Sequence, residues 1–204
     1  MFLVVIKIKK NMDSIFLKKI NNQYFYTDGN KENLKFVLEV AKILKLNKYL
    51  LIKTLKKFKG PKYRQEVIFK SDKLTIVNDS KATTFSSSVS LLKSLNNVHW
   101  IVGGQGKKGD KILLSKKNCK NIKAYVFGNN KFFFTSKLKK LIKYETFLDL
   151  QHLVKKLSLE IQFDKDRTHK TILFSPAAAS FDNFKNFEKR GEYFNQLIKR
   201  YINV

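Results

Sequence analysis

From residue 65 onward the chain alternates short apolar runs with longer stretches of helical periodicity, and this alternation limits the possible folds more than any other feature. The apolar runs are 65–69, 74–77, 98–102, 124–127, 144–146 and 171–174. The helical patterns are 84–95, 111–118, 132–141, 148–157 and 184–201. Strands that alternate with helices form a mostly parallel sheet with helices on both faces. The sequence therefore predicts an α/β domain.

The first 60 residues differ from this pattern. Apolar residues recur at spacings of three and four from 30 to 46, which predicts an amphipathic helix with Asn30 as a candidate N-cap. A second helical pattern stops at Gly60-Pro61, a strong break at which we place a hinge. Residues 14–26 indicate one or two strands about a turn.

We therefore expect two domains, 1–60 and 61–204, the first too small to hold its own core.

Composition indicates a folded, soluble protein of the cytoplasm. Hydrophobic residues make up 43% of the chain, more than disordered proteins carry at high charge. The apolar stretches fall well short of the roughly 20 residues that cross a membrane, and the N-terminus lacks the order of a signal peptide. The single Cys119 forms no internal disulfide, and no group of residues shows the spacing of metal ligands. We therefore expect no metal site within the chain.

The net charge of +26 leaves two interpretations open. A strongly basic domain attracts nucleic-acid phosphates, so the chain is a candidate stand-alone module that docks on nucleic acid or an acidic partner. However, nearly all of the 42 cations are lysines spread over every segment, whereas nucleic-acid sites favour the planar fork of arginine. Compositional bias with solvated lysine faces is the alternative, and it makes nucleic acid the less favoured partner.

The string N-D-S-K-A-T at 78–83 follows one predicted strand and precedes a helix. In a Rossmann-like sheet of this kind, ligands bind beyond the carboxyl ends of the strands, where a helix N-terminus favours anions. The alternative is that Thr83 or Thr84 simply caps the helix.

The string G-G-Q-G-K-K-G at 103–109 follows a second predicted strand. Its glycines allow close backbone approach, and a lysine held there can pair with a carboxylate or phosphate. The spacing is not that of a P-loop, and a purely structural turn is the alternative.

The string S-P-A-A-A-S-F-D-N-F-K-N-F-E-K-R-G at 175–191 follows the last predicted strand. Its small side chains leave room for a ligand at the backbone, and the hydroxyl of Ser180 suits a carboxylate. Phe184 and Phe187 are three residues apart, so core packing is the alternative, which we prefer for Phe184.

In order and in spacing, these three strings resemble the C-terminal part of the Mur ligase family, most of all its D-glutamate-adding members (MurD type). The resemblance extends from about residue 30 to the C-terminus. It implies a Rossmann-like C-terminal domain that binds the amino acid, preceded by a remnant of the central ATP-binding domain. It also implies D-glutamate contacts from Thr83, Lys107, Ser180, Phe181 and Phe187.

On the nucleotide side the resemblance implies Asp79 and Lys81, together with Arg64 after the hinge and Asn30 and Asn33 upstream. Lys62-Tyr63 and Gly29 stand where the family usually has Pro-His and His.

The implied activity is ATP-dependent amide formation, with Mg²⁺ as cofactor, between D-glutamate and UDP-N-acetylmuramoyl-L-alanine during peptidoglycan synthesis. The implied route is an acyl phosphate, with no catalytic nucleophile supplied by this chain. No glycine-rich string ending in Lys-Ser or Lys-Thr occurs among the 204 residues. We therefore expect the chain to be inactive alone, and a separate chain carrying the N-terminal domains is a further candidate partner.

Overall fold

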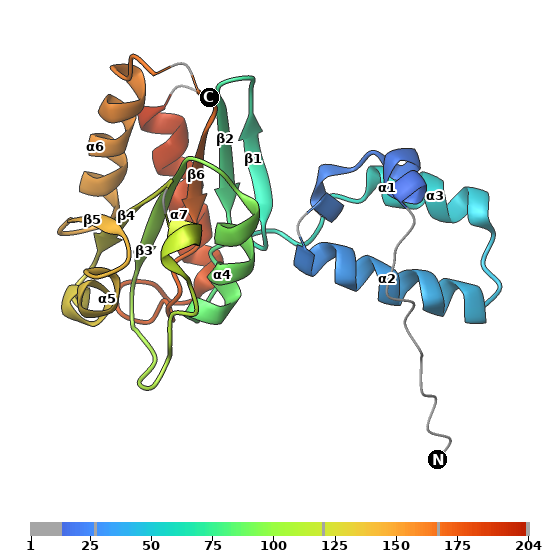
Figure 1. Cartoon of the computed structure of the whole chain (residues 1–204), viewed down its shortest axis with the longest axis horizontal. Helices are drawn as coiled ribbons and strands as arrows, with labels where there is room; N and C mark the ends of the chain where they lie inside the picture. Colours follow the sequence, from blue (N-terminus) through green and yellow to red (C-terminus); the bar gives the residue numbers. More distant parts are fainter. Residues whose placement is uncertain (1–13, 27, 120, 167, 203–204) are drawn as a thin grey trace. The chain divides into compact units, whose positions relative to one another are not determined.

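The computed structural model describes residues 14–26, 28–119, 121–166 and 168–202. The chain divides into two compact units, one extending to Gly60 and the other beginning at Pro61 (Figure 1). Residues 1–13, which belong to the first predicted domain, lie outside the described residues. Each unit is considered by itself below.

The N-terminal unit is entirely helical in its described part. It contains α1 (Ser14–Ile20), the 3₁₀ helix η1 (Gln23–Tyr26), α2 (Asp28–Ile43) and α3 (Lys48–Lys57). The prediction of strands at 14–26 is wrong. Leu17 and Ile20 are three residues apart, so a helix brings both onto one core-facing side, and Asn21 supplies the turn with φ of 45°.

This unit also has a small core, contrary to the prediction. Ile20, Phe25, Leu34 and Leu55 are buried together. The side chain of Asn22, in the turn after α1, ties this turn to the end of α3, because its amide donates to the carbonyls of Leu55 at 2.8 Å and Phe58 at 2.7 Å.

The second unit is built on a six-stranded sheet. Its strands are β1 (Glu66–Lys70), β2 (Leu74–Asn78), β3 (Val98–Gly103), β4 (Ile122–Phe127), β5 (Lys143–Thr146) and β6 (Lys170–Phe174). Their order is β1-β2-β6-β3-β4-β5, and only β1 runs antiparallel to its neighbour. The predicted α/β class with a mostly parallel sheet is confirmed.

Helices cover both faces of this sheet (Figure 1). One core contains residues of α4 (Phe85–Ser94) and α5 (Lys131–Leu138), and the other contains residues of α6 (Leu150–Gln162) and α7 (Phe187–Tyr201). Neighbouring residues of β3 illustrate the alternation, since Trp100 belongs to the first core and Ile101 to the second. Both faces are therefore apolar, as expected of parallel strands.

Two predicted helices differ from the structure. The last helix begins at Phe187 rather than at 184, because Asn186 accepts from the amide of Lys189 at 2.8 Å and caps it there. Within 111–118 only the 3₁₀ helix η2 (Lys116–Cys119) forms. The hydroxyl of Ser115 donates to Asn118 at 2.6 Å, a local bond that competes with a longer helix. Across the described ranges, no helix is long and apolar enough to cross a membrane.

Candidate functional site

The three predicted ligand loops meet at one edge of the sheet. They follow β2, β3 and β6, and β6 pairs in parallel with both of the others. Their carboxyl ends therefore lie side by side, which is the location at which open α/β sheets hold ligands.

Backbone hydrogen bonds join these loops to one another. The amide of Asp79 donates to the carbonyl of Phe174 at 2.7 Å, and the amide of Ala178 donates to Ala82 at 3.3 Å. Gln105 and Ala179 exchange two bonds of 3.0 Å each. The relative positions of the loops are consequently fixed by the main chain.

Glycine is required where the loop after β3 meets its neighbours. Gly103 has φ of +152°, and a Cβ there would lie 2.3 Å from the carbonyl oxygen of Phe127. Gly104 has φ of +120°, and its Cβ would lie 2.7 Å from the carbonyl oxygen of Ala179. A side chain at Gly103 would push the end of β3 away from the end of β4, and one at Gly104 would force the loops after β3 and β6 apart.

Asp79 is the buried acid of the site. Its carboxylate accepts from the hydroxyl of Ser175 at 2.8 Å and from the amide of Gln65 at 3.1 Å. Burial raises the pKa of Asp79 to about 7, although these two bonds and the cation of Arg64 act in the opposite direction. Asp79 thus links the loop after β6 to the segment after the hinge.

Arg190 is the residue that the sequence interpretation missed. Its guanidinium is fully buried and donates to the carbonyls of Ser80 at 2.7 Å and Ala178 at 2.9 Å. Burial lowers its pKa to about 10, which still leaves it charged at neutral pH. The available signal was Arg190 followed by Gly191, where a Cβ would lie 2.4 Å from the ring of Tyr63.

The start of α4 is already capped. Thr84 accepts from the amide of Ser87 at 3.4 Å, and the carboxylate of Asp110 accepts from the amide of Phe85 at 2.7 Å. The capping alternative is therefore correct for Thr84, while the side chain of Thr83 is exposed. The carboxylate at this helix N-terminus thus comes from Asp110, which directly follows the glycine-rich string at 103–109.

The other residues predicted to contact the amino acid differ in exposure. Lys107 is exposed, Ser180 is buried, and Phe181 is 72% exposed. Phe187 is half-buried, and the ammonium of Lys81 lies 4.2 Å from its ring centre. The structure thus pairs a predicted nucleotide residue with a predicted amino-acid residue.

Phe184, for which we preferred core packing, is half-buried with its ring 5.7 Å from that of Tyr193. Both line a pocket of about 390 Å³ beyond the end of β4, together with Phe127 and Asn183.

The residues predicted on the nucleotide side belong to both units. Asp79 and Lys81 follow β2, and Arg64 is an exposed side chain between the hinge and β1. Asn30 lies inside α2, which begins at Asp28, so its interpretation as an N-cap is wrong. Its buried amide instead donates to the carbonyl of Tyr24 at 2.7 Å, whereas Asn33 is exposed.

In the part of the chain that the structure describes, no three His, Cys, Asp or Glu side chains are grouped to hold a metal ion.

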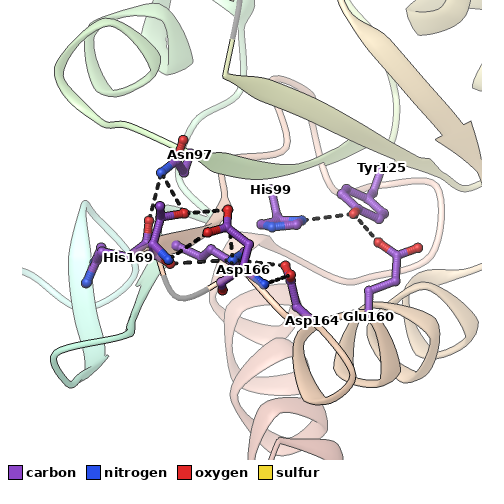
Figure 2. Close-up of polar contacts among 9 residues, drawn as sticks. Asn97, His99, Tyr125, Glu160, Asp164, Asp166 and His169 are labelled. Atoms are coloured by element: carbon purple, nitrogen blue, oxygen red, sulfur yellow. Dashed lines mark hydrogen bonds and ion pairs between the residues drawn. The ribbon is translucent and has the colours of Figure 1, made fainter.

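The amino ends of the strands carry a different set of polar residues (Figure 2). His99 on β3 and Glu160 on α6 both bond to the hydroxyl of Tyr125, at 2.9 and 2.5 Å. Nearby, the ammonium of Lys170 contacts Asp164 at 2.9 Å and Asp166 at 3.7 Å. Burial lowers the pKa of His99, so it is neutral at pH 7. These side chains satisfy one another.

No family model matches the chain. Among curated proteins, it is similar to UDP-N-acetylmuramoylalanine--D-glutamate ligases. The relative from the Wolbachia of Brugia malayi is 37% identical over 172 residues, which cover 84% of this chain and 34% of the relative. The relative from Rickettsia bellii is 31% identical over 185 residues, which cover 91% and 41%. The chain thus spans well under half the length of these relatives and corresponds to a C-terminal part of them.

The similar solved structures are Mur ligases as well. A MurF structure from Acinetobacter baumannii superimposes with a TM-score of 0.58 at 14% identity, over 87% of this chain and 38% of that one. The UDP-N-acetylmuramate-alanine ligase MurC from Thermotoga maritima gives a TM-score of 0.54 at 13% identity, over 85% and 38%. At such identities the likeness shows the fold alone.

Proposed function

Because this chain resembles the C-terminal part of the D-glutamate ligases over most of its length, we propose that it is the amino-acid-binding part of such a ligase. The whole enzyme would add D-glutamate to UDP-N-acetylmuramoyl-L-alanine at the expense of ATP, in the cytoplasm. One observation carries the proposal: the three strings that resemble the family lie on three loops joined by backbone hydrogen bonds at one edge of the sheet.

The side chains of these loops suit D-glutamate, which has two carboxylates and one amine. We assign Lys107 to one carboxylate, because an ammonium forms charge-assisted hydrogen bonds with it. The hydroxyls of Thr83 and Ser180 serve as further donors. The rings of Phe181 and Phe187 are assigned to the apolar wall against the carbon chain.

The nucleotide is assigned to other residues in and near the loop after β2. Arg64 and Lys81 supply positive charge for phosphates, and Asp79 is the acceptor among them. Asn30 and Asn33 are the proposed contribution of the N-terminal unit, which we interpret as the remnant of the ATP-binding domain. Residues 61–204 then form the amino-acid-binding domain.

The proposed reaction proceeds in two steps. A carboxylate oxygen of UDP-N-acetylmuramoyl-L-alanine attacks the terminal phosphorus of ATP, and ADP leaves. The neutral amine of D-glutamate then attacks the acyl carbon, phosphate leaves, and the nitrogen loses a proton to form the amide. The loops of this chain hold and orient the amine, an effect that raises its local concentration at the acyl carbon. Mg²⁺, when bound, would stabilise the phosphate charges.

Amide-resolved NMR of the full chain tests the amino-acid site. We expect D-glutamate, more than L-glutamate, to shift the amide signals of Thr83, Lys107 and Ser180. Lys107→Ala should weaken binding at least tenfold, since it removes a charge-assisted contact. The neighbouring Lys108→Ala is the matched control and should bind as the unaltered chain does. Equal shifts with both enantiomers, or none, would contradict the assignment.

The purified chain alone should not join D-glutamate to UDP-N-acetylmuramoyl-L-alanine with ATP and Mg²⁺ present. Appearance of the amide product, followed by mass spectrometry, would overturn this expectation.

A second candidate is a basic binding module. It is favoured by the net charge of +26 and by an open pocket of about 730 Å³ beside β5, lined by Lys139, Lys140 and Lys143. Phosphate neutralisation makes nucleic-acid affinity fall steeply with salt. Retention on random DNA that is lost as salt rises would favour this candidate. Weak retention at all salt concentrations would remove it.

A further inference from the structure

Asp110 joins two of the loops that carry the proposed amino-acid site. Its half-buried carboxylate accepts from the amide of Phe85 at 2.7 Å, and Phe85 opens α4 directly after the loop that follows β2. Among the described residues, this is the one hydrogen bond that runs between the stretches 78–85 and 103–110. The backbone bonds described above connect each of these stretches to the loop after β6 instead.

The same residue closes the turn that carries Lys107. The amide of Asp110 donates to the carbonyl of Lys107 at 3.1 Å. Within the turn, Gly109 has φ of +82°, a conformation that glycine adopts readily. Lys107, Lys108 and Gly109 are all exposed. Because its middle faces solvent, the position of this turn depends on how its two ends are held.

One pair of stacked rings holds both ends. Phe85 and Phe133 lie with their ring centres 6.1 Å apart and their planes 15° apart, and Phe85 is fully buried. The amide of Phe85 binds Asp110 at one end of the turn. At the other end, Gly106 lies so close to Phe133 that a Cβ would be 2.3 Å from the ring. The backbone of Lys107 is thus fixed from both sides, although its side chain is exposed.

The bond to Asp110 also occupies the start of α4. The amide of Phe85 is one of the donors that a helix N-terminus offers to an anion. With the carboxylate of Asp110 bound to it, this amide is not available to a carboxylate of D-glutamate. The assignment of Lys107 to that carboxylate therefore depends on where the turn holds it.

We propose that Asp110 is a positioning residue for the amino-acid site. It holds the turn of Lys107 at the start of α4 and so fixes the Lys107 backbone relative to Thr83, which lies two residues before Phe85. The inference rests on the proposed function, since it takes D-glutamate as the ligand of both residues. Donors held at a fixed separation bind a dicarboxylate more tightly than donors on independent loops, because less conformational freedom is lost on binding.

Titrations of the full chain with D-glutamate, followed by amide NMR, test the role of Asp110. Asp110→Ala removes the acceptor and should raise the dissociation constant at least fivefold. Asp110→Asn keeps an oxygen that can accept from the amide of Phe85, so its dissociation constant should stay within twofold of that of the unaltered chain. Since both variants remove the charge, the difference between them isolates the hydrogen bond.

Thr84→Ala is the matched control. It removes the other cap of α4, the bond from the amide of Ser87, and leaves the bond between Asp110 and Phe85 in place. Its dissociation constant for D-glutamate should change less than twofold.

Two further measurements separate positioning from a general loss of structure. Amide relaxation should show order parameters at Lys107 and Lys108 that fall from about 0.85 to about 0.6 in Asp110→Ala, but not in Thr84→Ala. In a chain that already carries Lys107→Ala, adding Asp110→Ala should change the dissociation constant less than twofold, because the group that Asp110 positions is absent.

Five results would overturn the proposal: an unchanged affinity in Asp110→Ala, loss of its folded amide spectrum, equal weakening by Thr84→Ala, failure of Asp110→Asn to bind better than Asp110→Ala, or a further fivefold weakening in the Lys107→Ala chain. Absence of D-glutamate binding by the unaltered chain would instead reject the proposed amino-acid site, and the inference with it. Binding by the unaltered chain that is equally strong in Asp110→Ala would reject the inference alone.

Discussion

The two edges of the sheet use polar groups in opposite ways. At the carboxyl edge the main chain makes the connections, as in the paired amides and carbonyls of Gln105 and Ala179, while Thr83 and Lys107 remain exposed. At the amino edge the side chains bond to one another, as Tyr125 does with His99 and Glu160 (Figure 2). A surface whose loops are fixed by backbone keeps its side chains available for a ligand. We therefore expect the amino edge, where the side chains bond to one another, to have a structural role.

This comparison also separates two kinds of buried charge. Arg190 reaches in from α7 to backbone carbonyls at the carboxyl edge, and its third nitrogen, Nη1, has no hydrogen-bond partner among the described residues. Lys170 at the amino edge instead contacts the carboxylates of Asp164 and Asp166. Removing Arg190 would release the loops after β2 and β6 at once, whereas removing Lys170 would affect only its contacts with Asp164 and Asp166.

The largest effect should come from Gly104→Ala. The new Cβ would meet the carbonyl oxygen of Ala179 at 2.7 Å, in a backbone conformation unfavourable for any other residue. We expect a loss of about 3–5 kcal/mol in the free energy of unfolding, measured by urea denaturation. Gly109→Ala is the matched control, because Gly109 has φ of +82° with nothing within 4 Å of its Cβ position, and only the conformational cost of about 1–2 kcal/mol applies. Equal losses would show that the loops do not need this close approach.

Asp79→Asn should remove a pH dependence. The pKa of Asp79 is about 7 in the folded chain, against 3.8 for the ordinary side chain. Between these two pH values the folded chain binds one proton more than the unfolded chain, so it loses stability as pH rises through 7. The variant should lack this fall and exceed the unaltered chain by about 2–4 kcal/mol at pH 8. Urea denaturation of the variant and of the unaltered chain from pH 5 to 8 measures the pH dependence and the difference at pH 8.

Asp164→Asn provides the contrast from the amino edge. Its hydrogen bond with Lys170 lowers the pKa of Asp164, so the stability it contributes is present above pH 4 and is lost as pH falls further. If the two aspartates changed the free energy of unfolding with the same sign as pH rises, the distinction between the two edges would be refuted.

Tyr125→Phe should cost about 1–3 kcal/mol of stability, because it leaves Glu160 and His99 without their shared hydroxyl. D-Glutamate binding should be unchanged. Tyr193→Phe removes a longer bond, 3.2 Å to Gln151, from a less buried hydroxyl and should cost less. A fall in D-glutamate affinity in Tyr125→Phe would give the amino edge a role in binding.

The smallest effect on stability should come from Thr83→Ala, within about 0.5 kcal/mol, as expected of an exposed side chain. Its effect should fall on D-glutamate affinity instead. Thr84→Ala next to it removes the cap of α4 and should cost about 1 kcal/mol while leaving affinity intact. Thermal unfolding and NMR titration of the two variants separate these roles, and the reverse pattern would exchange their assignments.

The sequence predicted the sheet because its signal is repeated: apolar runs of three to five residues, separated by helical patterns, occur along the whole second unit. It failed at 14–26, where α1 has seven residues and therefore fewer than two turns of periodicity to read. It also misplaced the start of α7, because the apolar spacing of Phe184 and Phe187 suits a helix equally well on either side of the Asn186 cap.

At the candidate site, the positions of the three loops followed from the strand pattern, but their connections did not. Arg190 is buried because the carbonyls of residues 80 and 178 both accept hydrogen bonds from it. No spacing of residues near Arg190 in the sequence predicts these contacts. Asn30 likewise reads as a cap in sequence, whereas its amide bonds to the preceding 3₁₀ helix. Contacts between distant segments decide both cases.

The position of β6 determines the order in which this unit can assemble. β1 and β2 pair with each other, and β3, β4 and β5 pair among themselves, but only β6 joins the two groups. A nascent chain that has not yet released residues 170–174 from the ribosome therefore holds two separate half-sheets with unpaired inner edges. Such edges are prone to mispairing, so we expect mispairing to be most frequent before β6 is in place.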